Sequence, residues 1–290
     1  MNLKYLTLSL ATSVLLLGQA GAQAQTTPTP PPAAAVTTNI VTTQMQDLIK
    51  QVRAKLKDGK KTEAELAPEL KAFDDLIAAH PTEKDDAIAQ VLFMKAQLYL
   101  EVIENTEKGT ALIQQLKTDY PDTKLGKRAD KILAGIEKQK AAKQIQAGLA
   151  TGADFPDFAE KDLNGQPLSV GGLKGKVVLV DFWATWCGPC RGELPNVIAT
   201  YKKHHAEGFE IIGVSLDSER PALDEFLKKQ DGMTWPQFYD GQGWGNKLAV
   251  KYGVESIPFA VLVGPDGKII GKELRGQELE DAVAGALAKK

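Results

Sequence analysis

The chain has 290 residues, of which 43% are hydrophobic and 25% are charged, and its formal net charge at pH 7 is -2. This length allows one to two domains, and the composition excludes a disordered or membrane-embedded chain in favour of a soluble globular protein. The near-neutral charge gives no reason to expect nucleic-acid binding.

The N-terminal 24 residues have the parts of a secretory signal peptide. Lys4 precedes an apolar stretch over residues 6–18, and Ala22-Gln23-Ala24 follows as the expected cleavage site. We therefore expect residues 1–24 to be removed and the protein to lie in the periplasm or another extracytoplasmic compartment. The alternative is an uncleaved membrane anchor, although the apolar stretch is shorter than the roughly 20 residues that span a bilayer. Residues 25–41, rich in Thr, Pro and Ala, predict an extended linker.

Residues 42–150 are expected to form a small all-α domain. An internal repeat lies inside it, because Phe73, Leu76, Ile77, His80 and Pro81 align with Ile113, Leu116, Lys117, Tyr120 and Pro121. The repeated unit is a helix, a proline-containing turn and a second helix, with a period of about 40 residues. This arrangement resembles tetratricopeptide-like helical hairpins. Such hairpins could bind a partner or act as a spacer, and the sequence leaves both functions open.

Gly148 and Thr151-Gly152 interrupt the helical pattern, so we expect a second domain over residues 151–290. Asn164-Gly165, between two short extended runs, predicts a β-hairpin at its start. The β-branched run over residues 177–180 predicts a strand buried on both faces of a parallel or mixed sheet. An apolar face at helical spacing then predicts a helix that carries Leu194, Val197, Ile198 and Tyr201.

Both cysteines of the chain lie between this strand and this helix, in the motif Cys187-Gly188-Pro189-Cys190. The chain has no second cysteine pair for a structural disulfide, and its three histidines lack metal-ligand spacing. We therefore expect a reactive cysteine pair that needs no metal and no cofactor. Free backbone N–H groups and the dipole at a helix N-terminus stabilise a thiolate, so Cys187 is the expected nucleophile. Cys190, one turn further on, is expected to attack the mixed disulfide and release the substrate.

The remaining pattern predicts alternating strands and helices up to the C-terminus. Pro265-Asp266-Gly267 predicts the turn of a closing antiparallel hairpin. The expected strands cover residues 211–216, 235–239, 259–263 and 268–274, and the expected helices cover residues 221–229 and 246–252 and a last segment that carries Leu279, Val283 and Leu287.

Several of these features resemble the active site and cis-proline loop of the thioredoxin fold: Trp186 before the cysteine motif, Pro195 in the following helix, and Ser256-Ile257-Pro258 before an apolar run. The lead-in Phe155-Pro156-Asp157-Phe158, together with Glu193, more narrowly resembles the extracytoplasmic TlpA/ResA-like thiol–disulfide oxidoreductases. The resemblance covers roughly residue 152 to the end. It implies an α/β thioredoxin fold with an N-terminal β-hairpin and a central αβ insertion, preceded here by the helical-hairpin domain.

The resemblance also implies roles for residues around the sulfurs. Pro258 would be cis and would place the backbone of Ile257 where a substrate strand can pair with it, beside Gly188 and Pro189. Trp186 would belong to the exposed docking surface, whereas Trp183 would mainly pack inside the domain. Independently of the resemblance, we expect Trp235 and Trp244 to be structural members of the insertion.

Two acids are candidates for handling the proton of Cys190. Asp181 matches the buried acid of thioredoxins, and as a lone carboxylate ending an apolar strand its pKa should be raised by desolvation. Glu193 lies one turn after Cys190 and shares its helical face. The sequence leaves open which acid acts as the proton acceptor.

The function predicted on these grounds is reduction of protein disulfides, with the pair kept reduced by a membrane electron-donor protein. The alternatives are a disulfide oxidant or isomerase, and a helical partner-binding scaffold with an accessory redox domain. A peroxiredoxin is disfavoured, because that family needs a threonine where this chain has Ala184.

Overall fold

The computed structural model describes residues 33–289, so the expected signal peptide, residues 1–24, lies outside the described part of the chain. The helices and strands divide into two compact units, with the division between Glu83 and Lys84. Among residues 33–289, every helix is too short or too polar to cross a bilayer.

The first unit contains helices α2 (Ala33–Lys57) and α3 (Ala67–Ala78), which pack against each other. Helix α2 begins inside the segment expected to be an extended linker, residues 25–41. The physical reason is the alanine run that follows the last proline of the segment, since alanine has the highest helix propensity. The described part of the expected linker is therefore helical.

The second unit begins with three helices, α4 (Asp86–Gln97), α5 (Thr106–Asp119) and α6 (Ala129–Gly148). Asp85 caps α4 through its carboxylate, which accepts hydrogen bonds from two backbone N–H groups at 3.0 Å. A small apolar cluster joins the three helices and contains Ala96, Ile113, Ala129 and Ile136. The N-terminal region is thus helical as expected, and its likeness to tetratricopeptide hairpins stays a prediction.

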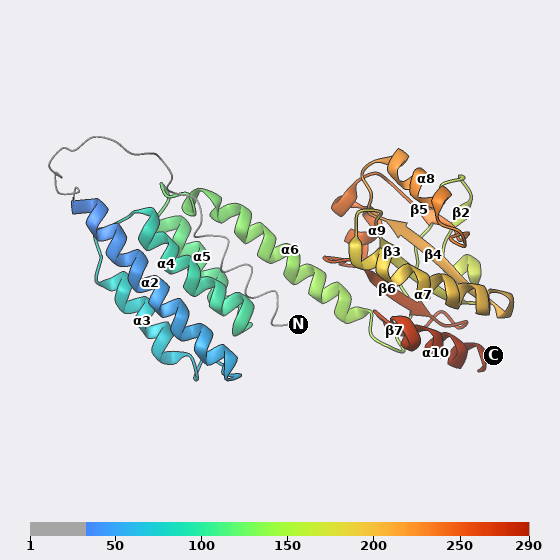
Figure 1. The fold of residues 1–290 in the computed structure, drawn as a ribbon, viewed down its shortest axis with the longest axis horizontal. Helices are drawn as coiled ribbons and strands as arrows, with labels where there is room; N and C mark the ends of the chain where they lie inside the picture. Colours follow the sequence, from blue (N-terminus) through green and yellow to red (C-terminus); the bar gives the residue numbers. More distant parts are fainter. Residues whose placement is uncertain (1–32, 290) are drawn as a thin grey trace, which may run out of the picture. The chain divides into compact units, whose positions relative to one another are not determined.

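A mixed five-stranded sheet forms the core of the rest of this unit, in the order β5-β4-β3-β6-β7 (Figure 1). The central strand β3 runs parallel to β4 and antiparallel to β6, and its first four residues are at most 1% exposed, which confirms a strand buried on both faces. The strands are β3 (Val177–Trp183), β4 (Phe209–Ser215), β5 (Gln237–Phe238), β6 (Phe259–Val263) and β7 (Ile269–Lys272).

Helices α7 (Gly188–His204) and α10 (Gly276–Leu287) pack against each other, and α7 contacts β4 while α10 contacts β3. The thioredoxin fold is confirmed, with both additions that the sequence predicts. The first is the antiparallel hairpin of β1 (Glu160–Lys161) and β2 (Pro167–Leu168), and the second is α8 (Arg220–Lys229) with β5, inserted before α9 (Lys247–Lys251).

The C-terminal end of α6 is attached to the thioredoxin-like part of the same unit. The side-chain amide of Gln146 donates to the carbonyl of Gly253 at 2.5 Å, and Lys272 donates to the carbonyl of Gln146 at 2.7 Å. Leu149 is 1% exposed and belongs to the core that surrounds the sheet. Residues just before the expected boundary at 151 therefore contribute to the packing of the domain that follows.

Candidate active site

The two cysteines lie at the N-terminus of α7, where β3 has ended. Cys187 is the N-cap residue, and its Sγ accepts a hydrogen bond from the backbone N–H of Cys190 at 3.2 Å. Gly188 begins the helix and Pro189 follows in its first turn, where a missing N–H costs little. The cysteines form a disulfide with each other and are only 4% and 6% exposed. In the dithiol form, the same N–H groups and the helix dipole would stabilise a thiolate at Cys187.

The loop before β6 brings a second segment to the sulfurs. Its Ile257–Pro258 peptide bond is cis, as the resemblance implies. Pro258 lines the same narrow cavity as Cys190, and its carbonyl oxygen accepts a hydrogen bond from the Arg275 guanidinium at 2.7 Å. Arg275 precedes α10, so this bond ties the loop to that helix. Arg275 is not predictable from the sequence, because no local pattern indicates a contact to Pro258.

The narrow cavity beside Cys190 brings together the two acids that the sequence proposes. It has a volume of about 20 Å³, enough for one water molecule, and its charged lining residues are Asp181, Glu193 and Arg275. Asp181 and Glu193 come from β3 and α7, so the predicted acids do meet beside the resolving cysteine.

Asp181 lies inside β3 and not at its end, because the strand continues to Trp183 with Asp181 paired to Gly213 and Ala260. Burial raises the pKa of Asp181 to about 7, and although the Arg275 charge lowers the pKa and the Glu193 charge raises it, burial has the largest effect. Within the described residues its carboxylate forms no hydrogen bond to protein. It can therefore exchange a proton near neutral pH.

Glu193 is held by contacts that serve the packing of two helices. One carboxylate oxygen accepts the backbone N–H of Gly276 at 2.6 Å, and the other accepts the side-chain amide of Asn196 at 3.2 Å. Gly276 is the first residue of α10, so Glu193 supplies an acceptor to a free N–H group at that helix terminus. This bond links α7 to α10 next to the cavity.

The four tryptophans divide into two buried and two exposed side chains. Trp183 and Trp235 are 4% and 3% exposed, which confirms their expected packing role. Trp186 is 52% exposed beside the cysteines, as the docking-surface expectation requires. The expectation for Trp244 is wrong, because this side chain is 43% exposed and its ring lies 6.0 Å from that of Trp186. The resemblance gave no signal here, since Trp244 lies in the insertion.

A buried carboxylate that the sequence analysis did not single out holds the loop before Cys187. Asp217 is 2% exposed and accepts the backbone N–H and the hydroxyl of Thr185, the latter at 2.5 Å. It also accepts the hydroxyl of Ser215 at 2.8 Å. A lone acid just after the apolar run of β4 is the signal that could have indicated it. The acceptor fixes the course of residues 184–187 and so the direction of Trp186.

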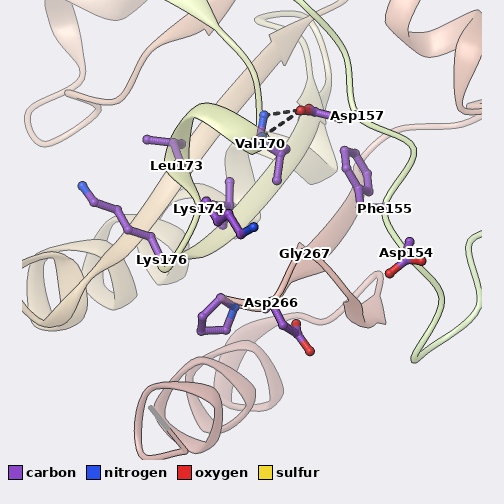
Figure 2. Close-up of a pocket in the computed structure, with 13 residues that line it drawn as sticks. Asp154, Phe155, Asp157, Val170, Leu173, Lys174, Lys176, Asp266 and Gly267 are labelled. Atoms are coloured by element: carbon purple, nitrogen blue, oxygen red, sulfur yellow. Dashed lines mark hydrogen bonds between the residues drawn. The ribbon is translucent and has the colours of Figure 1, made fainter.

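A larger cavity lies at the opposite end of the sheet, near the start of β3, and contains neither cysteine (Figure 2). Its volume is about 260 Å³, and its lining includes Asp157 and Lys176. The Asp157 carboxylate accepts the backbone N–H groups of Val170 and Gly171 at 2.8 Å, and Lys176 pairs with Glu210 at 2.6 Å. The Asp157 and Lys176 charges are thus already paired with groups of the protein.

Comparisons with known proteins agree with this geometry. The profile of the redoxin family, described as Redoxin, matches residues 150–287. The thiol-disulfide oxidoreductase ResA of Bacillus thuringiensis is 34% identical over 138 residues, which cover 48% of this chain and 77% of that protein. The chain belongs to the ResA-like thiol-disulfide oxidoreductases.

Two further proteins are similar to part of this thiol-disulfide oxidoreductase. Tryparedoxin of Trypanosoma brucei brucei is 36% identical over 116 residues, which cover 39% of this chain and 79% of tryparedoxin. The solved thioredoxin domain of a thiol-disulfide oxidoreductase from Bacteroides vulgatus is 36% identical, covers 47% of this chain and 97% of that chain, and has a TM-score of 0.43.

Proposed function

We propose that this enzyme reduces protein disulfides outside the cytoplasm, with Cys187 as nucleophile and Cys190 as resolving thiol. The observation that carries the proposal is the position of Cys187 as N-cap of α7, with its sulfur 3.2 Å from the N–H of Cys190. A group at this position gains stability as an anion, which lowers the free energy of the attacking thiolate.

In the first step the Cys187 thiolate attacks one sulfur of the substrate disulfide. A bond forms between Cys187 and that sulfur, the substrate S–S bond breaks, and the departing substrate thiolate takes up a proton. The substrate segment pairs with the backbone of Ile257, as the resemblance to the thioredoxin fold implies. Trp186, Gly188 and Pro189 complete the contact surface.

In the second step Cys190 attacks the sulfur of Cys187. The enzyme disulfide forms, the mixed disulfide breaks, and the second substrate thiol leaves, so two electrons pass from the enzyme dithiol to the substrate. Asp181 takes the proton of Cys190, directly or through one water in the cavity of about 20 Å³. Its pKa of about 7 suits this transfer, whereas Glu193 is committed to the N–H of Gly276 and acts as a positioning residue.

The reducing direction rests on the residues between the cysteines. Gly188-Pro189 matches thioredoxin, whose reduction potential is about -270 mV, and not the strong disulfide oxidants near -120 mV. After each turnover a membrane electron-donor protein returns the pair to the dithiol form. The signal-peptide features of residues 1–24 support the extracytoplasmic location.

The helical region before residue 150 selects or positions partners and takes no part in the chemistry. Full-length protein and a fragment that starts at Thr151 are therefore expected to reduce hydroxyethyl disulfide, a small disulfide without recognition features, at similar rates. With the natural protein partner, turnover of the fragment should fall, because a tethered binding region raises the effective concentration of the partner. The measurement is turnover with each substrate.

A second fragment, starting at Lys138, is the matched control for folding. It keeps Gln146 and Leu149, so it should be more stable than the Thr151 fragment by roughly 2–4 kcal/mol, the usual range for one buried leucine and its adjacent hydrogen bonds. If the folded Lys138 fragment fails to reduce the small disulfide, the helices complete the catalytic site. If full-length protein also fails, the proposed function is wrong.

A further inference from the structure

We propose that Trp244 and Trp186 together form a docking site for a large apolar side chain of the substrate protein, close to the disulfide that is reduced. This inference rests on the proposed function and adds a specificity determinant from the insertion. The two indoles form the surface that contacts the substrate side chain. This side chain is aromatic or large aliphatic and lies beside the substrate cysteine.

The exposure of the two indoles is the first observation. Trp186 and Trp244 are 52% and 43% exposed, whereas Trp235, from the same insertion, is 3% exposed. Their ring centroids are 6.0 Å apart with planes inclined at 56°, so the pair forms an open wedge instead of a closed stack. Paired aromatic surface left facing solvent is typical of a binding site, and tryptophan is enriched among the residues that dominate interface energies.

The second observation is that hydrogen bonds hold the base of the loop that carries Trp244. It lies in the Trp244 loop, residues 240–246, which ends at the fully buried Asn246. The Asn246 amide donates to the carbonyl of Ser215 and to the Asp240 carboxylate, both at 3.2 Å. Asp240 in turn accepts the backbone N–H of Lys247 at 2.9 Å. The base of the loop is thus held by hydrogen bonds to the end of β4, to the start of α9 and between Asn246 and Asp240.

The third observation is that the same residue anchors both indoles. The carbonyl oxygen of Ser215 accepts a hydrogen bond from the Asn246 amide of the Trp244 loop. The Ser215 hydroxyl donates a hydrogen bond to Asp217 at 2.8 Å. Asp217 binds Thr185, the residue before Trp186. The chain segments that carry both indoles are therefore held from the end of β4, which limits the backbone entropy lost when a guest side chain binds.

The place of the pair in the chain identifies its occupant. Trp186 adjoins Cys187, so whatever contacts the wedge also lies next to the sulfur that undergoes exchange. The occupant is then part of the substrate polypeptide near its disulfide. The apolar surface and inclined rings of the two indoles suit an aromatic side chain best, because it can make edge-to-face contact. A side chain of the size of leucine is the second-best fit.

The test uses reduced full-length protein and a set of peptides with one intramolecular disulfide. The peptides differ at a single position beside a cysteine, which is Phe, Leu, Ser or Lys, and the second-order rate constant of reduction is measured for each. Wild-type protein is expected to prefer Phe over Ser by about tenfold, and Trp244→Ala should remove most of that ratio. Trp244→Phe should restore part of it. Val250→Ala, which truncates another exposed apolar side chain, in α9, should leave the ratio unchanged.

Each other outcome is decisive. An equal fall for all peptides in Trp244→Ala would mean a structural role for Trp244 and would overturn the inference, as would an unchanged Phe-to-Ser ratio. A wild-type preference for Lys would replace apolar docking by cation–π binding and would also overturn it. If wild-type protein reduces none of the peptides, the proposed function fails and not only this inference.

Discussion

Replacing Cys187 with serine is expected to abolish disulfide reduction to the uncatalysed background. The hydroxyl of serine stays protonated at neutral pH even at a helix N-terminus, so the attacking anion is lost. Cys190 does not replace it, because Cys187 and not Cys190 is the N-cap residue of α7, where the free backbone N–H groups stabilise a thiolate. The measurement is the reduction rate of a small disulfide by pre-reduced protein.

Replacing the second cysteine, as in Cys190→Ser, should have a different effect. It keeps the nucleophile but cannot complete the second step, so mixed disulfides between Cys187 and natural substrates should accumulate. These adducts can be isolated under non-reducing conditions and should disappear in the variant that lacks both cysteines. Accumulation in Cys187→Ser and not in Cys190→Ser would reverse the roles of the two cysteines.

Replacing Asp181 with asparagine is expected to stabilise the oxidised protein by about 4 kcal/mol above pH 7. The pKa of Asp181 is raised from 3.8 to about 7, chiefly by burial. Each pKa unit corresponds to about 1.4 kcal/mol of unfolding free energy. The contribution of protonated Asp181 to stability is complete below about pH 4 and is lost as the pH rises to 7. Wild-type stability should therefore fall from pH 4 to pH 8, and the Asp181→Asn variant should lack this part of the fall.

Urea unfolding at pH 4 and pH 8 measures this difference. Asp231→Asn, at an exposed acid, is the matched control and should change stability little at either pH. The same Asp181→Asn variant should slow the resolving step and abolish its dependence on the Asp181 proton. Glu193→Gln should keep this pH dependence but displace it to lower pH, because the Glu193 charge raises the pKa of Asp181. Equal pH dependence of stability in wild type and Asp181→Asn would show that Asp181 is not the acid described above.

The parts of the fold that were predictable are those encoded by neighbouring residues. The buried strand before Cys187, the turn at Asn164-Gly165 and the hairpin around Pro265-Asp266-Gly267 each have a local signal, and all three are present. The cysteine motif and Asp181 could be found for the same reason. Local patterns also located Glu193, but not the N–H of Gly276 that it binds.

What the sequence did not show depends on contacts between distant residues. Asp217 meets Thr185 32 residues away, and Arg275 meets Pro258 17 residues away, each through a polar contact that no periodicity encodes. Exposure of Trp244 follows from how the insertion loop lies against the end of β4. Because tryptophan is buried in most contexts, composition alone favoured the wrong assignment.

The reduction potential of the Cys187–Cys190 pair tests the central claim most directly. It can be measured by equilibrating full-length protein with glutathione or dithiothreitol buffers and alkylating the free thiols. A disulfide reductase of this kind should give a value near -270 mV, as thioredoxin does. A value near -120 mV would make the dithiol the favoured form and the protein a disulfide oxidant, which would contradict the proposed function.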